Sequence, residues 1–462
     1  MTIEEIIAAP PPELLARALR DRAGFFYLDS ARHEGNGRPA FSFMGFEPFL
    51  TWRVKGESIT VHSGGAVEEF RGEPVAHLRE LMARYRAPRA GDIPFCGGAV
   101  GYFGYEFGAR AEGVRGTSAE ASSIPDAQFG FYDGVIAYDL ASGKTFAVAN
   151  PVAERSAGEI IAGLQAAVRG AVIRATPVSG DQPAARALTA NLTRADYLGR
   201  VARVKEYIAA GDVYQVNLSQ RFELATAEDP FIIYERLRKF SPAPFGAFLD
   251  GGGFQILSSS PELFLRIDET GHALTRPIKG TRPRGRTETE DQRLAAELLA
   301  SEKDHAELLM IVDLERNDLG RVCRYGSIVV EERHRIEAHP TVFHLVATIS
   351  GRLAEDRDRF DCLRSLMPGG SITGAPKIRA MQIIDELEPC RRDVYTGAIG
   401  YLGFDGTCDL NIAIRTIVCR GGRACYHVGG GIVSDSDPEA EYQETLTKGR
   451  AMRAALLGEE IP

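Results

Sequence analysis

Apolar residues recur at helical spacing after Thr193. They stand three or four positions apart at Tyr197, Val201, Val204 and Ile208, and residues at this spacing share one face of a helix. Thr193 is a residue type that caps helices at the amino end, and Gly211 is suited to end one. The pattern therefore predicts an amphipathic helix between Thr193 and Gly211.

The pattern changes to a period of two directly after this helix. Apolar Tyr214, Val216 and Leu218 alternate with polar residues, which is typical of a strand with two unlike faces. The polar face consists of Gln215, Asn217 and Ser219. We expect one face to pack against the core, while the other can meet a ligand.

Helix and strand patterns are mixed along the whole chain without a regular alternation of the two. This mixture predicts an α+β fold with large, mainly antiparallel sheets. The stretch from Thr176 to Pro183 is mostly polar and rich in turn formers. It is expected to divide the chain into an amino-terminal region at 1–175 and a second region at 190–455.

The composition is that of a soluble globular protein, with 44% hydrophobic and 25% charged residues among 462. A formal net charge of -9 argues against a nucleic-acid-binding surface. No apolar run reaches the length of a membrane span, and the start of the chain lacks the pattern of a signal peptide. The seven cysteines are scattered without Cys-x-x-Cys pairs, so reduced thiols in a cytoplasmic protein are expected.

Candidate chemistry begins at a lysine in the segment Arg276–Gly285. Its two prolines keep the segment extended, and Gly280 lets the backbone pass close to a ligand. Lys279 is thus presented by a stiff loop. Nearby cations could lower its pKa and make it a nucleophile, and the neighbouring arginines are Arg276, Arg282 and Arg284. From these residues alone, a basic loop that binds an anion or faces water is an equal alternative.

Two groups of carboxylates lie on predicted helices. The first helix starts at Asp437 and runs to about Leu457, and one face of it carries Glu441, Glu444 and Lys448. A solvated acidic face is the alternative there, although the preceding Gly429, Gly430 and Gly431 can point backbone amides at an anion. In the second group, Asp304 and Glu307 stand one turn apart beside the apolar run 308–312, a position that favours burial next to a partner or a metal.

Five ordered blocks between about Tyr214 and Lys448 resemble one family, the chorismate-utilising enzymes, which includes component I of anthranilate synthase and of aminodeoxychorismate synthase. The blocks are the lysine segment, Ser258–Glu262, Asp313–Asp318, Gly369–Lys377 and Glu441–Thr445. The resemblance implies a four-layer α/β/β/α sandwich in which both regions of the chain contribute to the sheets.

The resemblance also implies roles for individual residues. Mg²⁺ would be held by Glu307 and Glu444, with Glu441 as a water-mediated or supporting ligand. Lys279 would attack the substrate, Glu262 would protonate the departing hydroxyl, His344 would lie beside the ring and Thr373 near that hydroxyl. Groups that would bind the carboxylates of chorismate are Arg415, in the strand-like run Leu410–Thr416, Tyr401, Lys448 and the amides of Gly429, Gly430 and Gly431.

Two positions separate activities within the family. Anthranilate synthases usually have alanine where this chain has Lys279, whereas aminodeoxychorismate synthases typically have lysine. Relatives that add water typically have a lysine base at Gln215, and a glutamine fits enzymes that use ammonia. These residues predict synthesis of 4-amino-4-deoxychorismate from chorismate and ammonia, with the ammonia supplied by a separate glutaminase subunit or as free ammonium. The alternatives are anthranilate synthase component I and a non-catalytic regulatory protein that binds chorismate or an amino acid.

Overall fold

Several strands of the protein are buried at every position. In the computed structural model, which describes residues 1–30, 40–89, 91–114, 124–174, 187–339 and 342–460, these strands include β7 (Gly98–Phe103), β8 (Ala127–Tyr132) and β21 (Ala398–Gly403). A strand can bury both faces only where other layers cover both sides of its sheet. The central strands must therefore lie inside a layered structure.

Two sheets of twelve strands each form the centre of the described part of the chain, and neighbouring strands pair antiparallel. Sheet A runs in the order β1 (Thr2–Glu5), β10 (Lys144–Ala149), β9 (Gly134–Asp139), β3 (Phe41–Gly45), β2 (Phe26–Asp29), β13 (Phe245–Asp250), β14 (Phe254–Ser260), β23 (Thr416–Arg420), β24 (Arg423–Ile432), β12 (Gln215–Ala225) and β11 (Thr189–Ala190), and β20 (Gly374–Ala375) also pairs with β12. Sheet B runs in the order β17 (Ile278–Pro283), β19 (Val342–Arg352), β16 (His272–Arg276), β15 (Leu263–Ile267), β22 (Cys408–Ile412), β21, β7, β8, β4 (Leu50–Lys55), β5 (Ser58–Ser63) and β6 (Ala66–Arg71), and β18 (Val329–Ala338) also pairs with β19.

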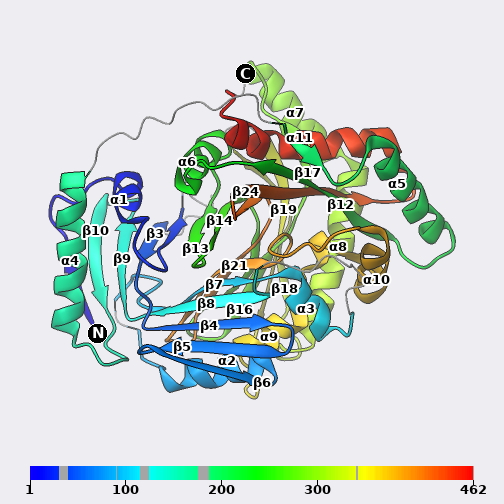
Figure 1. Ribbon diagram of the computed structural model, residues 1–462. Helices are drawn as coiled ribbons and strands as arrows, with labels where there is room; N and C mark the ends of the chain where they lie inside the picture. Colours follow the sequence, from blue (N-terminus) through cyan, green and yellow to red (C-terminus); the bar gives the residue numbers. More distant parts are fainter. Residues whose placement is uncertain (31–39, 90, 115–123, 175–186, 340–341, 461–462) are drawn as a thin grey trace.

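Helices cover the outer face of each sheet (Figure 1). Those on sheet A are α1 (Pro12–Leu19), α4 (Ala157–Arg174), α5 (Arg194–Ala209), α6 (Pro230–Phe240), α10 (Lys377–Leu387) and α11 (Pro438–Leu457). Those on sheet B are α2 (Pro74–Arg84), α7 (Glu288–Ala300), α8 (Glu302–Gly320) and α9 (Arg359–Leu366), and α3 (Tyr105–Ala111) contacts the cores on both sides. A third core, which contains Phe26 of sheet A and Tyr102 of sheet B, fills the space between the sheets. The four-layer α/β/β/α sandwich is therefore confirmed.

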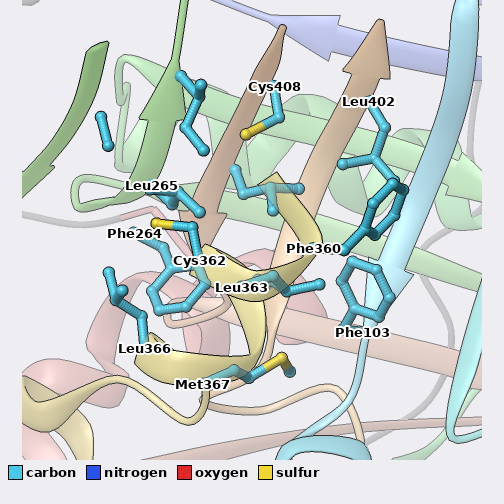
Figure 2. Packing of buried hydrophobic residues seen from close by; sticks show 14 of the residues in the cluster. Phe103, Phe264, Leu265, Phe360, Cys362, Leu363, Leu366, Met367, Leu402 and Cys408 are labelled. Carbon is cyan, nitrogen blue, oxygen red and sulfur yellow. The ribbon is translucent and has the colours of Figure 1, made fainter. Parts of the chain in front are cut away.

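Helix α9 illustrates how the outer layer is attached to sheet B. Phe360 and Leu363 point from α9 toward Phe103 and Leu402 on the strands, and Cys362 lies beside Phe264 (Figure 2). All of these side chains belong to one buried apolar cluster, so the hydrophobic effect fixes the helix on the sheet. The chain that leaves α9 continues directly into the short 3-10 helix η1 (Gly370–Ile372), which enters the candidate site.

The amino-terminal and carboxy-terminal parts of the chain share both sheets. Strand β2 pairs with β13 in sheet A, and β7 pairs with β21 in sheet B. The predicted boundary at 176–183 lies outside the described residues, so the division at that point stays a prediction. Among the described helices, none is long and apolar enough to cross a membrane.

Local patterns identified several elements correctly. Helix α5 begins after Thr193, whose side chain accepts a hydrogen bond from the amide of Asp196 in a capping box. Helix α11 begins after Asp437, whose side chain accepts a hydrogen bond from the amide of Ala440. Strand β12 has the predicted alternation, but the side chains of Gln215, Asn217 and Ser219 are buried as well, and Tyr395 lies next to Asn217.

Candidate active site

Two segments cross side by side from one sheet to the other. The first joins β14 in sheet A to β15 in sheet B and carries Glu262, and the second joins β22 in sheet B to β23 in sheet A and carries Arg415. The amide of Ile412 donates to the carbonyl oxygen of Glu262 at 3.0 Å, and the amide of Ser259 donates to that of Arg415 at 3.1 Å. The crossovers thus hold a carboxyl group and a guanidinium group close to the same place.

The predicted continuous strand at 410–416 is wrong. Strand β22 ends at Ile412 and β23 begins at Thr416, and Arg415 between them has a φ of 51°. Residues other than glycine rarely adopt this left-handed backbone conformation. The break arises because the chain leaves sheet B for sheet A at this point, so Arg415 sits at a turn between the sheets rather than within a strand.

The carboxyl group of Glu262 is buried and accepts a hydrogen bond from the hydroxyl of Ser371 at 2.7 Å. Burial raises the pKa of Glu262, and the charge of Lys279 opposes part of this rise. A raised pKa keeps a carboxyl group protonated closer to neutral pH, which a general acid requires. Ser371 was not anticipated from the sequence.

The ammonium group of Lys279 contacts the backbone of the same Ser371. Its Nζ donates to the carbonyl oxygen of Ser371 at 3.4 Å, and no carboxylate of the described residues lies within ion-pair distance of it. Burial lowers the pKa of Lys279, Lys448 lowers it further, and Glu307 and Glu262 oppose the change. Lys279 is therefore shifted toward the neutral, nucleophilic amine.

The arginines that flank Lys279 in the sequence do not supply the neighbouring positive charge. They are paired with acids instead: Arg276 with Glu337, Arg282 with Asp304 at 3.0 Å and Arg284 with Asp291 at 2.5 Å. The cation that contributes is Lys448, which comes from α11, and sequence spacing alone does not reveal it.

Carboxylates from two helices face this lysine. Glu307 projects from α8, and Glu441 and Glu444 project from α11 beside Gly430, where an added Cβ would lie 3.0 Å from Glu441 and 3.7 Å from Glu444. Burial raises the pKa of Glu307 and of Glu441, and the charge of Glu444 adds to both shifts. The Lys448 ammonium, 2.7 Å from Glu444, lowers the pKa of Glu444. These acids are thus close enough to repel one another.

This donor set fits Mg²⁺ if substrate and water oxygens complete the coordination. Within the residues that the structure describes, no three His, Cys, Asp or Glu side chains already lie close enough together to hold a metal ion. Mg²⁺ commonly takes one or two carboxylates together with waters and substrate oxygens. Glu307 and Glu444 supply two such carboxylates, and a divalent cation between them would relieve their repulsion.

Gln215 and His344, two further predicted residues, have buried polar atoms without hydrogen-bond partners. The amide group of Gln215 is buried without a partner for its nitrogen or oxygen, and it packs against Gly431. His344 is buried, its Nδ1 lies 3.0 Å from the hydroxyl of Thr281, and its Nε2 has no partner. Burial and the charge of Arg415 lower its pKa well below the usual range, so the imidazole is neutral. Thr373 is buried and donates to the carbonyl oxygen of Gly369 at 2.8 Å.

Tyr401 is not brought together with the other predicted residues. Its ring is tilted against that of Phe95, with centroids 4.4 Å apart, and it lines a separate cavity of about 520 Å³ together with Asp409. A different tyrosine, Tyr395, stacks on His427 of β24 and lies next to Asn217 of β12. Those two strands also carry Gln215 and Gly431. The sequence gives no signal for Tyr395, because its position depends on strands far away along the chain.

Comparison with known proteins agrees with this geometry. Residues 24–454 match the family described as chorismate binding enzyme. The chain belongs to the chorismate-binding enzymes.

Named relatives of this chorismate-binding enzyme have two activities. Anthranilate synthase component 1 of Acetivibrio thermocellus is 37% identical over 99% of this chain and 94% of its own length. Aminodeoxychorismate synthase component 1 of Salmonella typhimurium is 41% identical over 88% of each. Among solved structures, anthranilate synthase component I from Streptococcus pneumoniae TIGR4 superimposes with a TM-score of 0.80 at 31% identity, over 91% of this chain and 95% of that one.

Arg415 has the surroundings of an anion receptor in this chorismate-binding enzyme. Its guanidinium donates to the hydroxyl of Ser241 at 3.3 Å, and it forms no ion pair with the part of the chain that the structure describes. Burial lowers its pKa, and the charge of Glu262 opposes that change. A largely desolvated guanidinium that forms no ion pair is costly unless an anion joins it.

A second buried carboxyl group, Glu315, accepts a hydrogen bond from Thr275 and senses the charge of Glu262. Burial raises the pKa of Glu315 from an ordinary 4.5 to about 8. The folded state therefore binds more protons than the unfolded state between these values, and stability falls as the pH rises, by about 1.4 kcal/mol per pH unit.

We expect Glu315→Gln to abolish this pH dependence. Between pH 5.5 and pH 8, the free energy of unfolding in urea should fall by about 2–3 kcal/mol more in wild type than in the variant. The exposed Glu355→Gln should show no such gain. Parallel pH profiles for Glu315→Gln and wild type would contradict the assigned shift.

Proposed function

We propose that this chorismate-binding enzyme is component I of aminodeoxychorismate synthase, which converts chorismate and ammonia to 4-amino-4-deoxychorismate for p-aminobenzoate and folate biosynthesis. The observation that carries the proposal is Lys279. Its amine has a lowered pKa and shares Ser371 with Glu262, a carboxyl group whose pKa is raised. A candidate nucleophile and a candidate general acid thus bond to the same residue.

The chemistry that we propose is a double displacement. The amine of Lys279 forms a bond to C2 of chorismate while the C4–oxygen bond breaks, and the hydroxyl takes a proton from Glu262 and leaves as water. Ammonia then forms a bond to C4, the bond from C2 to Lys279 breaks, and the new ammonium group at C4 returns a proton to Glu262, so that both the lysine and the acid are regenerated. The covalent intermediate divides one difficult substitution into two easier ones.

The remaining charged groups hold the substrate. We assign the two carboxylates of chorismate to Arg415 and to the region of Lys448 and the Gly429–Gly431 amides. Mg²⁺, held by Glu307 and Glu444 with support from Glu441, would neutralise the charge of one carboxylate. His344 and Thr373 would orient the ring and its C4 hydroxyl.

The amino group must come from ammonia. Gln215 is a neutral amide that cannot act as the base for a water molecule, and this favours amination over hydration. We propose that a separate glutaminase subunit delivers the ammonia and that free ammonium can replace it. The cysteines of the described chain are free thiols, which fits action in the cytoplasm.

Anthranilate synthase component I is the second candidate. It is favoured by relatives of that name at similar identity, such as the protein from Acetivibrio thermocellus. A regulatory protein that only binds chorismate is less consistent with the site, because binding requires neither a lysine of lowered pKa nor a carboxyl group of raised pKa.

Product identification distinguishes these functions. The purified protein is incubated with chorismate, Mg²⁺ and ammonium, and the products are separated and identified by mass and fluorescence. We expect 4-amino-4-deoxychorismate as the main product. Anthranilate as the main product would establish the second candidate, and unchanged chorismate with saturable binding would establish a regulatory protein.

The variant Glu262→Gln tests the general acid. Turnover should fall by a factor of about 10² to 10⁴, whereas the dissociation constant for chorismate should stay within a few-fold of wild type. In wild type the activity should decline at high pH, where Lys279 is already neutral and Glu262 is ionised. Retained turnover together with a large loss of binding would contradict this role.

A further inference from the structure

A second cavity, of about 450 Å³, lies between the two sheets. Strands β2, β13 and β14 contribute from sheet A, and β4, β7 and β8 contribute from sheet B. None of its lining residues belongs to the site around Glu262 and Lys279. The volume falls within the usual range for small-molecule sites.

Aromatic rings form the walls of this inter-sheet cavity. Phe26 and Phe254 contribute from sheet A, and Tyr102 and Tyr132 contribute from sheet B. Gly130 lines the cavity as well, and a Cβ there would lie 2.6 Å from the hydroxyl of Tyr132. The absence of a side chain at Gly130 therefore allows the tyrosine to lie across the cavity wall.

Two polar side chains lie next to each other in the cavity. Arg53 and Gln128 each donate a hydrogen bond of 3.1 Å to the carbonyl oxygen of Gly251. Each also keeps one buried polar atom without a partner, Nε of Arg53 and Oε1 of Gln128. Gln128 is only 9% exposed, and no acid in the described ranges forms an ion pair with Arg53.

Both tyrosine hydroxyls and the carboxylate of Asp250 in the cavity are already bonded. The hydroxyl of Tyr132 donates to the carbonyl oxygen of Gly24 at 2.6 Å, and that of Tyr102 donates to Pro125 at 2.8 Å. Asp250 accepts from the amides of Gly24 and Gly252. The atoms that remain free to bond are therefore a cationic donor, Nε of Arg53, and an adjacent acceptor, Oε1 of Gln128. Buried polar atoms usually have a hydrogen-bond partner.

We propose that the inter-sheet cavity binds a small aromatic carboxylate with an amino or hydroxyl group next to the carboxylate. The carboxylate would pair with Arg53, the neighbouring donor would bond to Oε1 of Gln128, and the ring would pack between Phe26, Tyr102 and Phe254. This inference does not depend on which product the catalytic site makes.

Titration with 2-aminobenzoate, followed by its fluorescence, tests the proposal. Wild type should bind it saturably, and 2-aminobenzamide, which has the same shape without the charge, should not compete. Arg53→Gln should weaken binding at least about tenfold and Gln128→Leu about threefold or more, because each removes one partner of the ligand. Arg53→Lys, which keeps the charge, should retain part of the affinity if Arg53→Gln folds poorly.

Two controls locate the bound probe. Arg22→Gln removes a half-exposed arginine that does not line the cavity but pairs with Glu47, which does, and it should leave the affinity within twofold. Arg415→Gln should also leave it unchanged, because Arg415 belongs to the other site. Thermal unfolding confirms that each variant is folded. Loss of binding in Arg415→Gln, equal binding in Arg53→Gln, or no saturable binding to wild type would each overturn the proposal.

Discussion

Replacing Lys279 by alanine is expected to reduce synthesis of 4-amino-4-deoxychorismate by a factor on the order of 10³ or more, because the nucleophile is lost. Binding of chorismate and Mg²⁺ should persist, since Arg415, Lys448 and the acids remain. A small amount of direct ammonia addition at C2 is also expected, and it would appear as aminodeoxyisochorismate or anthranilate.

Mass spectrometry of the intact protein provides the direct measurement. Wild type exposed to chorismate without ammonia should gain mass, and digestion should place the gain on the peptide that contains Lys279. Lys279→Ala should show no gain, whereas the exposed Lys144→Ala should behave as wild type. An undiminished rate of aminodeoxychorismate synthesis by Lys279→Ala would overturn the covalent mechanism.

The pH dependence follows from the same two groups. The reaction needs a neutral Lys279 and a protonated Glu262, so activity should be greatest between the two pKa values and fall on either side of them. With ordinary pKa values of 10.5 and 4.5, only about one molecule in a million would hold both forms at once. Each unit by which burial lowers the first pKa or raises the second increases that population about tenfold.

The second large effect is expected for Glu307→Gln. Activity at moderate Mg²⁺ should fall by roughly two orders of magnitude or more, because an amide is a much weaker ligand for Mg²⁺ than a carboxylate. The free energy of unfolding should stay the same or increase slightly, because the substitution removes a half-buried carboxylate whose pKa is already raised.

Initial rates measured across a Mg²⁺ titration, together with urea unfolding, check this result. Glu302→Gln is the matched control on the same helix, since Glu302 is exposed, and it should keep wild-type rates. Glu444→Gln should behave like Glu307→Gln. Near-normal turnover of either site variant at limiting Mg²⁺ would show that the metal is held elsewhere.

Local patterns predicted the elements that depend on local chemistry. The cap at Thr193, the alternation in β12 and the start of α11 each depend on neighbouring residues. The order of strands in the sheets does not follow from such patterns. The resemblance to a family supplied the sandwich instead.

The errors in the site have a common physical cause. Contacts between distant segments explain each of them. They break the strand before Arg415 and place Tyr401 in a separate cavity. They also make Lys448, and not the flanking arginines, the cation near Lys279. Ser371 and Tyr395 were missed for the same reason. Spacing along the chain does not reveal which segments meet. The inter-sheet cavity could not be predicted from the sequence for the same reason.

The paired crossovers at Glu262 and Arg415 have a mechanical consequence. Each group lies on a segment that connects the two sheets, and hydrogen bonds from the amides of Ile412 and Ser259 join the two segments. Neither group can move away without shearing one sheet over the other, so this part of the site should lack low-energy local opening. Its amide hydrogens should therefore exchange with solvent only when the whole sandwich unfolds, as slowly as those at the centre of the protein.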